Sequence, residues 1–161
     1  MTAEPTPDPT IRRAVTIDRP RADVFELFTH HTAAWWPLAN GTYNGLNTVE
    51  IVIEPRSGGL VYEIARDGSR MVWGRVLDWQ PPAHMAYSYR PFGDERFTEV
   101  KVWFDAVAPT RTEVRVHHLG WEAHGAIGFQ RARSYLGGWE HKLHLLRRAA
   151  QERAQEGRDE Q

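Results

Sequence analysis

The residues best suited to chemistry in this sequence are its eight histidines, among which two close pairs are candidates for a site. His141 and His144 lie three residues apart in a stretch of helical pattern, next to Glu140. This spacing places two metal-binding side chains on one helix face, but a zinc site needs three or four converging ligands. No further ligand follows at a recognisable spacing, so we expect exposed histidines and no bound metal.

The second pair, His117 and His118, is adjacent in a predicted strand. Neighbouring strand residues point to opposite faces of a sheet, so the two rings cannot bind one ion from the same side. One of them, with His118 as our candidate, can face the interior as a polar anchor or an acid–base group. The alternative is an ordinary strand histidine whose ring nitrogens are hydrogen-bonded.

Other charged residues give weaker signals. Glu50, Glu63, Glu99 and Glu113 stand singly on predicted strands, and we interpret them as solvated residues of the outer face. Arg75 has the same strand parity as nearby tryptophans, so it either anchors a ligand beside them or extends to the surface. There is no Ser-His-Asp order, H-E-x-x-H, G-x-G-x-x-G or Walker A motif. The sequence therefore assigns no catalytic residue and no cofactor.

Aromatic side chains are the strongest signal, with seven Trp, five Tyr and six Phe. They supply core volume and ligand-facing surface, and Trp and Tyr carry polar tips that need partners. We expect some of them to surround an apolar pocket of roughly 300–1,000 Å³ and others to be core. The candidate ligand-binding residues are Trp36, Tyr43, Tyr62, Trp73, Arg75, Tyr87, Tyr89, Phe104, His118, Phe129, Tyr135 and Trp139.

Length and composition limit the classes of protein. A chain of 161 residues that is 41% hydrophobic is expected to form one domain with one core. The net charge of -1 provides no field that would attract nucleic acid or an anionic membrane. The absence of cysteine fits a cytoplasmic location, and no signal peptide or membrane span is visible. We expect a disordered tail at residues 1–10, one domain at 11–150 and a polar tail at 151–161.

The first third of the chain predicts a strand at residues 11–17 and a helix from Pro20 that buries Val24, Phe25 and Phe28. A second short helical piece at 30–36 ends at Pro37, and a loop covers 38–48. The pattern then changes to period two, which predicts antiparallel strands at 49–54, 60–64, 71–79, 84–90, 100–105 and 111–119. Alternation lets Tyr62, Trp73, Tyr87 and Phe104 share one face of the sheet.

A long helix is predicted at residues 125–150, and the sheet must pack against it. Its apolar stripe consists of Leu136, Trp139, Leu143, Leu146 and Ala150. Residues 137 and 138 are both glycine, which either lets the helix approach or bend over the sheet or provides a hinge that opens a ligand chamber. A curved antiparallel sheet wrapped around this helix buries all the stripes at once, which is an α+β architecture.

Six short motifs carry a family resemblance. They are PRADVFELF at 20–28, Trp35-Trp36-Pro37, Gly58-Gly59 followed by Tyr62-Glu63, Trp73-Gly74-Arg75-Val76, Pro81-Pro82 and Gly138-Trp139. In this order, over roughly residues 11–150, they resemble the SRPBCC superfamily (START-like, Bet v 1-like). The branch is that of the homologues of the activator of the heat-shock protein 90 ATPase. The resemblance implies a helix-grip fold with two short helices after the first strand. Within the branch, the combination is more similar to self-resistance proteins than to true co-chaperones.

Three functions follow from these observations and the resemblance. The first is binding of a small hydrophobic, aromatic or polyketide-like ligand between sheet and last helix, for sequestration or self-resistance, by a protein that is not an enzyme. The second is a cyclase or aromatase like those of the superfamily. The third, a co-chaperone, is disfavoured because only about ten residues precede the first strand, where true activators carry a docking domain. We expect no stimulation of the heat-shock protein 90 ATPase, and a homodimer is compatible with the sequence.

Overall fold

The computed structural model describes residues 9–90 and 95–159, without the side chains of 129, 134–137 and 157–159. The elements follow one another as β1 (Ile11–Ile17), α1 (Arg21–His30), η1 (Thr32–Ala34), α2 (Leu38–Gly41), η2 (Gly45–Asn47), β2 (Thr48–Ile53), β3 (Leu60–Ala65), β4 (Arg70–Gln80), β5 (His84–Tyr89), β6 (Thr98–Ala108), β7 (Arg111–Leu119), η3 (Trp121–Ile127) and α3 (Gly128–Asp159).

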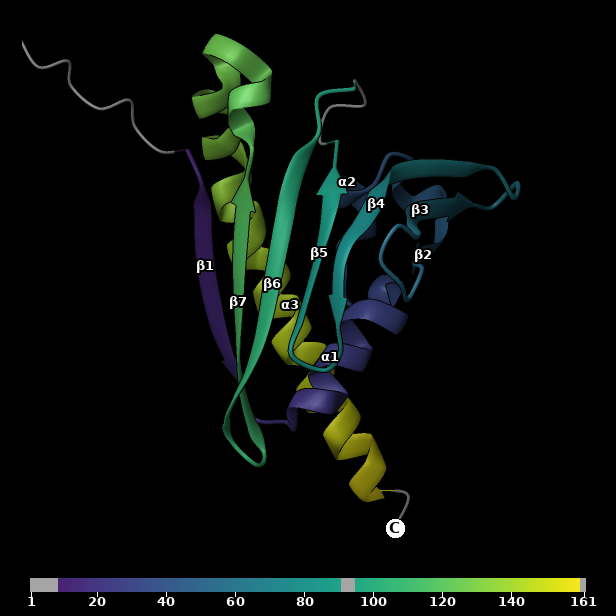
Figure 1. Ribbon diagram of the computed structural model, residues 1–161. Coiled ribbons are helices and arrows are strands. Elements are labelled where there is room, and N and C mark those ends of the chain that lie inside the picture. The colour runs from purple at the N-terminus through teal and green to yellow at the C-terminus, as the bar shows by residue number, and fades with distance from the viewer. Residues whose placement is uncertain (1–8, 91–94, 160–161) are drawn as a thin grey trace, which may run out of the picture.

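The strands form one antiparallel sheet in the order β1-β7-β6-β5-β4-β3-β2. The long helix α3 crosses one face of this sheet, and α1 lies beside its lower half (Figure 1). The predicted α+β architecture is therefore confirmed: a curved sheet wrapped around the last helix, with short helices after β1. No helix in the described part of the chain is long and apolar enough to cross a membrane.

The boundaries differ from the prediction mainly in irregular segments. The helical piece expected at 30–36 is a single turn, η1, and the loop expected at 38–48 contains the short helices α2 and η2. The last helix begins at Gly128 after the turn η3, and it continues to Asp159, beyond the predicted end at residue 150. The predicted tail at 1–10 lies largely outside the described residues.

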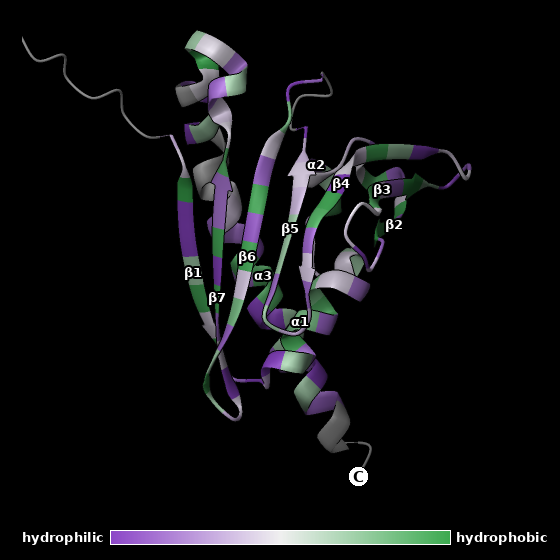
Figure 2. Ribbon diagram, viewed as in Figure 1, coloured by the Kyte–Doolittle hydropathy of each residue, from purple (hydrophilic) through white to green (hydrophobic). Residues whose placement is uncertain are grey.

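The predicted alternation is confirmed on β5, β6 and β7, whose inward residues are buried (Figure 2 shows the alternation along β6). It is wrong on β3, because Val61, Glu63 and Ala65 point inward and Tyr62 points to the outer face. The sequence indicated the other face because Leu60, Tyr62 and Ile64 form the more apolar parity of the strand.

A β-bulge on β4 explains a second error of parity. Val61 pairs with Gly74 while the next residue, Tyr62, pairs with Val72, so Trp73 is an extra residue in the ladder. Such a bulge reverses the parity of the strand beyond it. Trp73 is consequently buried, whereas Arg75 is exposed rather than lying on the same face.

Two glycines behave in opposite ways. A Cβ added to Gly74 at the bulge would lie 1.9 Å from the carbonyl oxygen of Ser88, so only glycine fits between β4 and β5. A Cβ added to Gly138 would meet no atom within 4 Å. The expected close approach of helix to sheet is therefore wrong at Gly138, which faces open space. Gly137 is outside the described side chains.

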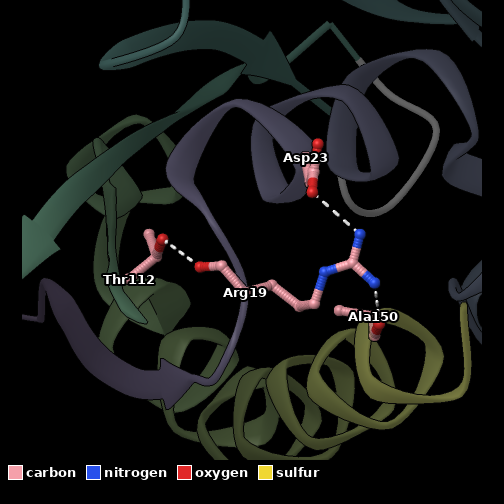
Figure 3. Close-up of polar contacts among 4 residues, drawn as sticks. All are labelled: Arg19, Asp23, Thr112 and Ala150. Atoms are coloured by element: carbon pink, nitrogen blue, oxygen red, sulfur yellow. Dashed lines mark hydrogen bonds and ion pairs between the residues drawn. The ribbon is translucent and has the colours of Figure 1, made fainter. Parts of the chain in front are cut away.

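The lower half of α3 is fastened to the rest of the fold by Arg19, in the link between β1 and α1 (Figure 3). Its guanidinium donates to the carbonyl oxygen of Ala150 at 3.4 Å and forms an ion pair with Asp23 at 2.8 Å. Its own carbonyl oxygen accepts a hydrogen bond of 2.8 Å from the hydroxyl of Thr112 on β7. One residue thus joins helix, sheet and the start of α1.

We expect Gly138→Ala to raise the free energy of unfolding by about 0.5–1 kcal/mol, because alanine is the better helix former and the space is open. Gly74→Ala is the matched control and should lower it by about 1–3 kcal/mol through overpacking. Urea unfolding of both variants measures the difference. Destabilisation by Gly138→Ala would contradict the open-space interpretation.

Candidate functional site

Five buried side chains form a closed circuit between the sheet and α3. We call this circuit, which consists of Trp36, Trp73, Tyr89, His118 and Trp139, the aromatic cluster. Going round it, the ring centroids are 5.2, 5.4, 6.0, 6.1 and 5.9 Å apart. All five are at most 7% exposed. The segment after α1, the sheet and α3 each contribute, so the cluster exists only in the folded chain.

His118 is the polar member of the aromatic cluster. Its Nδ1 accepts a hydrogen bond of 3.0 Å from the indole N–H of Trp139, so its Nε2 carries the proton and donates to the hydroxyl of Thr98 at 2.7 Å. That hydroxyl donates in turn to the carbonyl oxygen of Tyr89. Burial, followed by the charges of Lys142 and His124, holds the pKa of His118 well below its usual value. His118 is therefore a neutral anchor, and its predicted inward orientation is confirmed.

Lys142 places a charged group against the aromatic cluster. Its Nζ lies 4.5 Å from the ring centroid of Trp36 and 4.9 Å from that of Trp139, and the residue is only 6% exposed. Burial lowers the pKa of Lys142 from 10.5 to about 8. The indole faces attract the cation and offset part of this desolvation. The amino group of Lys142 is therefore still mostly protonated at pH 7, although its pKa lies close to that pH.

A buried carboxylate supports the opposite side of the aromatic cluster. Glu63 on β3 is 0% exposed and accepts a hydrogen bond of 2.7 Å from the indole N–H of Trp73. Its oxygens also accept from the backbone N–H groups of Tyr43 and Asn44, the amide of Asn44 and the hydroxyl of Thr48. Burial alone would raise the pKa of Glu63, but these hydrogen bonds outweigh it and lower the pKa. The expectation of a solvated outer-face residue is wrong here.

The other predicted site residues lie at the border of this arrangement or apart from it. Tyr87 is 2% exposed and contacts Tyr89 with rings 6.4 Å apart, so it borders the aromatic cluster. Tyr43 is half-buried, and its hydroxyl donates to the carbonyl oxygen of Arg90. Phe104 packs on Phe25 and α1, at a different part of the core.

Two candidates face outward, and two cannot be placed. The guanidinium of Arg75 is exposed and donates to the carbonyl oxygen of Gly58 at 3.0 Å. Tyr62 lies on the outer face, with the guanidinium of Arg70 4.8 Å from its ring centroid. The side chains of Phe129 and Tyr135 lie outside the described residues.

The histidine pair on the last helix faces away from the aromatic cluster. His141 and His144 are exposed, and the neighbouring Glu140 pairs with Arg13 at 2.9 Å. Within the described residues no group of three or more metal-binding side chains converges. His117 lies on the outer face against Trp103, with rings 4.7 Å apart.

Sequence reasoning missed Glu63 and Lys142, although signals for both were present. Lys142 is three residues after Trp139 and four before Leu146, which places it within the buried stripe of α3. A charged residue inside an apolar stripe was the signal. Glu63 lies two residues from both Val61 and Ala65 on β3, so the three side chains share one face, the less apolar one. This shared face with two apolar residues was the signal for Glu63.

An external hollow of about 400 Å³ is lined by described residues between α1 and the turn that joins β4 and β5. It contains no member of the aromatic cluster. Its lining consists of Ala22, Phe25, Glu26, His30, Pro55, Trp79, Pro81 and Pro82.

The hydrogen bonds of Glu63 predict acid sensitivity. Its stabilisation is present above the ordinary carboxyl pKa of about 4.3 and is lost as the pH falls through its lowered folded value. We expect Glu63→Gln to cost about 2 kcal/mol or more of unfolding free energy at pH 7, because an amide presents hydrogens to buried donors. Urea unfolding at decreasing pH should also show that the free energy of unfolding falls less steeply in acid for Glu63→Gln than for the wild-type protein. Glu50→Gln, at an exposed position, is the control; equal behaviour of the two variants would contradict the assignment.

The buried ammonium of Lys142 predicts a gain of stability with rising pH in the alkaline range. Because the pKa of Lys142 is lower in the folded chain, the unfolded chain binds more protons between pH 8 and 10.5, and stability rises with pH there. We expect Lys142→Met to raise the free energy of unfolding at pH 7 by about 1–3 kcal/mol, and to lack this rise. Lys101→Met, at a half-buried position on β6, should change neither. Destabilisation by Lys142→Met at pH 7 would refute the prediction.

Comparison with known proteins places this geometry in a family. The family model described as "Activator of Hsp90 ATPase homolog 1-like protein" matches residues 18–151. No protein of curated function matches the sequence.

Several solved structures are similar. The anthrahydroquino-γ-pyrone synthase Txn09, complexed with SUM, is 30% identical, with 78% of this chain and 84% of that chain covered and a TM-score of 0.55. The self-sacrificing resistance protein CalC from Micromonospora echinospora is 25% identical over 91% of this chain and 96% of its own, with a TM-score of 0.66. The Aha1 dimer from Colwellia psychrerythraea shares the fold at 18% identity, covering 88% and 95%, with a TM-score of 0.64. The chain therefore belongs to the family of Activator of Hsp90 ATPase homolog 1-like proteins, with an SRPBCC (Bet v 1-like) fold.

Proposed function

We propose that this protein binds a small hydrophobic molecule, aromatic or polyketide-like, on the aromatic cluster between the sheet and α3, and holds it for sequestration or self-resistance. The observation that carries the proposal is the closed circuit of five buried aromatic side chains with the ammonium of Lys142 against it. Rings with polar tips favour a flat, polarisable guest over a flexible alkyl chain, because stacking adds to the burial of area.

The energetics of the interior support a role beyond packing. A lysine surrounded by indoles costs stability that an apolar residue of similar volume would not. Such a side chain is typical of a site that uses its charge. Gly138, next to Trp139, is not packed against the sheet, because a Cβ added there would meet no neighbouring atom within 4 Å.

Two relatives support this role. CalC is a self-sacrificing resistance protein, and Txn09 is an anthrahydroquino-γ-pyrone synthase whose structure is a complex with SUM. Both resemble this chain over most of its length.

A second candidate is an enzyme like the cyclases and aromatases of the superfamily. The observation that favours it is the 30% identity with Txn09, a synthase. His118 and Lys142 would then position a substrate enol, without a dedicated acid–base pair. A co-chaperone role rests on the family description alone, and a homodimer stays a prediction.

Binding is tested by titrating a panel of polycyclic aromatic molecules while tryptophan fluorescence and the melting temperature are measured. We expect quenching and a higher melting temperature with planar members. Trp36→Leu should weaken binding about tenfold, because it removes a stacking face worth roughly 1.4 kcal/mol. Phe104→Leu, equally buried but packed against α1, should lower stability and leave affinity unchanged.

The fate of the bound molecule separates binder from enzyme. Chromatography of the ligand after overnight incubation should recover it unchanged if the protein sequesters it. Conversion to a cyclised product, faster than in buffer, would favour the enzyme. A panel that moves neither fluorescence nor melting temperature would reject both.

A further inference from the structure

The external hollow between α1 and the turn that joins β4 and β5 has the size and the rigidity of a small-molecule site. Its volume of about 400 Å³ lies within the roughly 300–1,000 Å³ typical of such sites. Three of its lining residues are prolines, Pro55, Pro81 and Pro82, whose rings have almost no side-chain entropy to lose when a guest binds. The hollow is therefore largely formed before any ligand arrives.

Two aromatic side chains give the hollow a flat surface. Phe25 on α1 is 4% exposed, whereas Trp79 on β4 is only half-buried. The centroids of these two rings are 5.2 Å apart at an interplanar angle of 64°, and the ring of His30 lies 6.2 Å from Trp79 at 84°. These contacts with α1 fix the orientation of the indole. A half-buried indole beside a hollow provides a surface on which a flat ring can pack.

The charge of the lining is negative. The side chain of Glu26 is 64% exposed, and its carboxylate lies 3.8 Å from Nε2 of His31, which is long for an ion pair. No lysine or arginine is among the described residues that line the hollow. Arg56, which follows Pro55 in the chain, contacts Glu54 at 3.6 Å. The lining thus attracts a cation and repels an anion.

The exposure of Glu26 suits an organic cation. Beside an exposed carboxylate an ammonium group keeps part of its hydration, so the cost of desolvating the charge is small. The attraction is correspondingly modest, about two- to fivefold in affinity for an exposed pair. The indole of Trp79 adds to it, because aromatic rings attract cations as well as flat apolar groups.

We propose that this hollow is a binding site of its own for small aromatic cations, with the flat ring of the guest against Trp79 and the prolines and its ammonium group beside Glu26. No member of the aromatic cluster is among the described lining residues. The proposal goes beyond the proposed function and does not depend on it.

Three probes of one shape and different charge test the proposal: 2-naphthylmethylammonium, the neutral 2-naphthylmethanol and the anion 2-naphthoate. Each is titrated at pH 7 and low salt into the isotope-labelled protein while the indole N–H signals are followed by nuclear magnetic resonance. The signal of Trp79 is the one missing from the spectrum of Trp79→Phe. We expect the cation to shift it with an affinity two- to fivefold higher than that of the alcohol, and the anion to bind more weakly than both.

Three variants locate the guest. Glu26→Gln should lower the affinity of the cation to that of the alcohol, whose own affinity changes less than twofold. Glu140→Gln is the matched control, because the side chain of Glu140 is 63% exposed and also has one ion-pair partner, Arg13. It should change neither affinity. Ala22→Phe, at an exposed position of α1, fills the hollow and should weaken both probes at least fivefold. Melting curves establish that each variant is folded.

Several results would overturn the proposal. A Trp79 signal that no probe shifts would mean that the hollow is not a binding site. Equal affinities for cation, alcohol and anion, or a cation preference that survives Glu26→Gln, would reject the selection of charge. An equal loss in Glu140→Gln would assign the preference to the net charge of the protein. Binding to the aromatic cluster is read separately, from the indole signal that Trp36→Leu removes, so none of these results decides the proposed function.

Discussion

The geometry of the candidate site depends on the hydrogen bonds that the buried carboxylate of Glu63 accepts. Its five hydrogen bonds come from the segment at residues 43–44, from Thr48 on β2 and from Trp73 on β4. Without an acceptor at this point, several of those donors would be buried and unsatisfied. Trp73, held in this way, contacts both Trp36 and Tyr89. The carboxylate thus fixes the bulged strand and the irregular segment that surround the aromatic cluster.

The interior is divided into two parts of different character. Around α1 the core is apolar, with Phe104 packed edge-on against Phe25 and Phe28. On the side of β4 and the middle of α3 it contains a carboxylate, an imidazole and an ammonium among indoles. The first part supplies stability through simple burial. The second part is less stabilising because charged and polar groups are buried in it, and such a loss of stability is common where a protein recognises a ligand.

The fold could be predicted from the sequence because periodicity and turn residues determine it locally, whereas the site depended on features that periodicity does not carry. The strand at 111–119 was placed with its bounds correct, and His118 was a candidate for the interior. Arg75 was given the strand parity of Trp73, with extension to the surface as the alternative, and the bulge at Trp73 places it at the surface. An isolated glycine within a strand, here Gly74, is the sequence sign of such a bulge. Glu63 was missed since five donors distant in sequence make its burial favourable. Lys142 was missed because the buried face of a helix is usually predicted from the positions of its apolar residues alone.

The contact of Trp36 with both Trp73 and Trp139 also has an optical consequence. Indoles whose centroids are 5.2 and 5.9 Å apart, at fixed and different orientations, couple their electronic transitions. We therefore expect an indole signal in near-ultraviolet circular dichroism that depends on α3 being seated on the sheet, while the far-ultraviolet signal reports mainly helix and strand content. Loosening of the helix from the sheet, with secondary structure intact, becomes visible as the loss of one signal and the retention of the other.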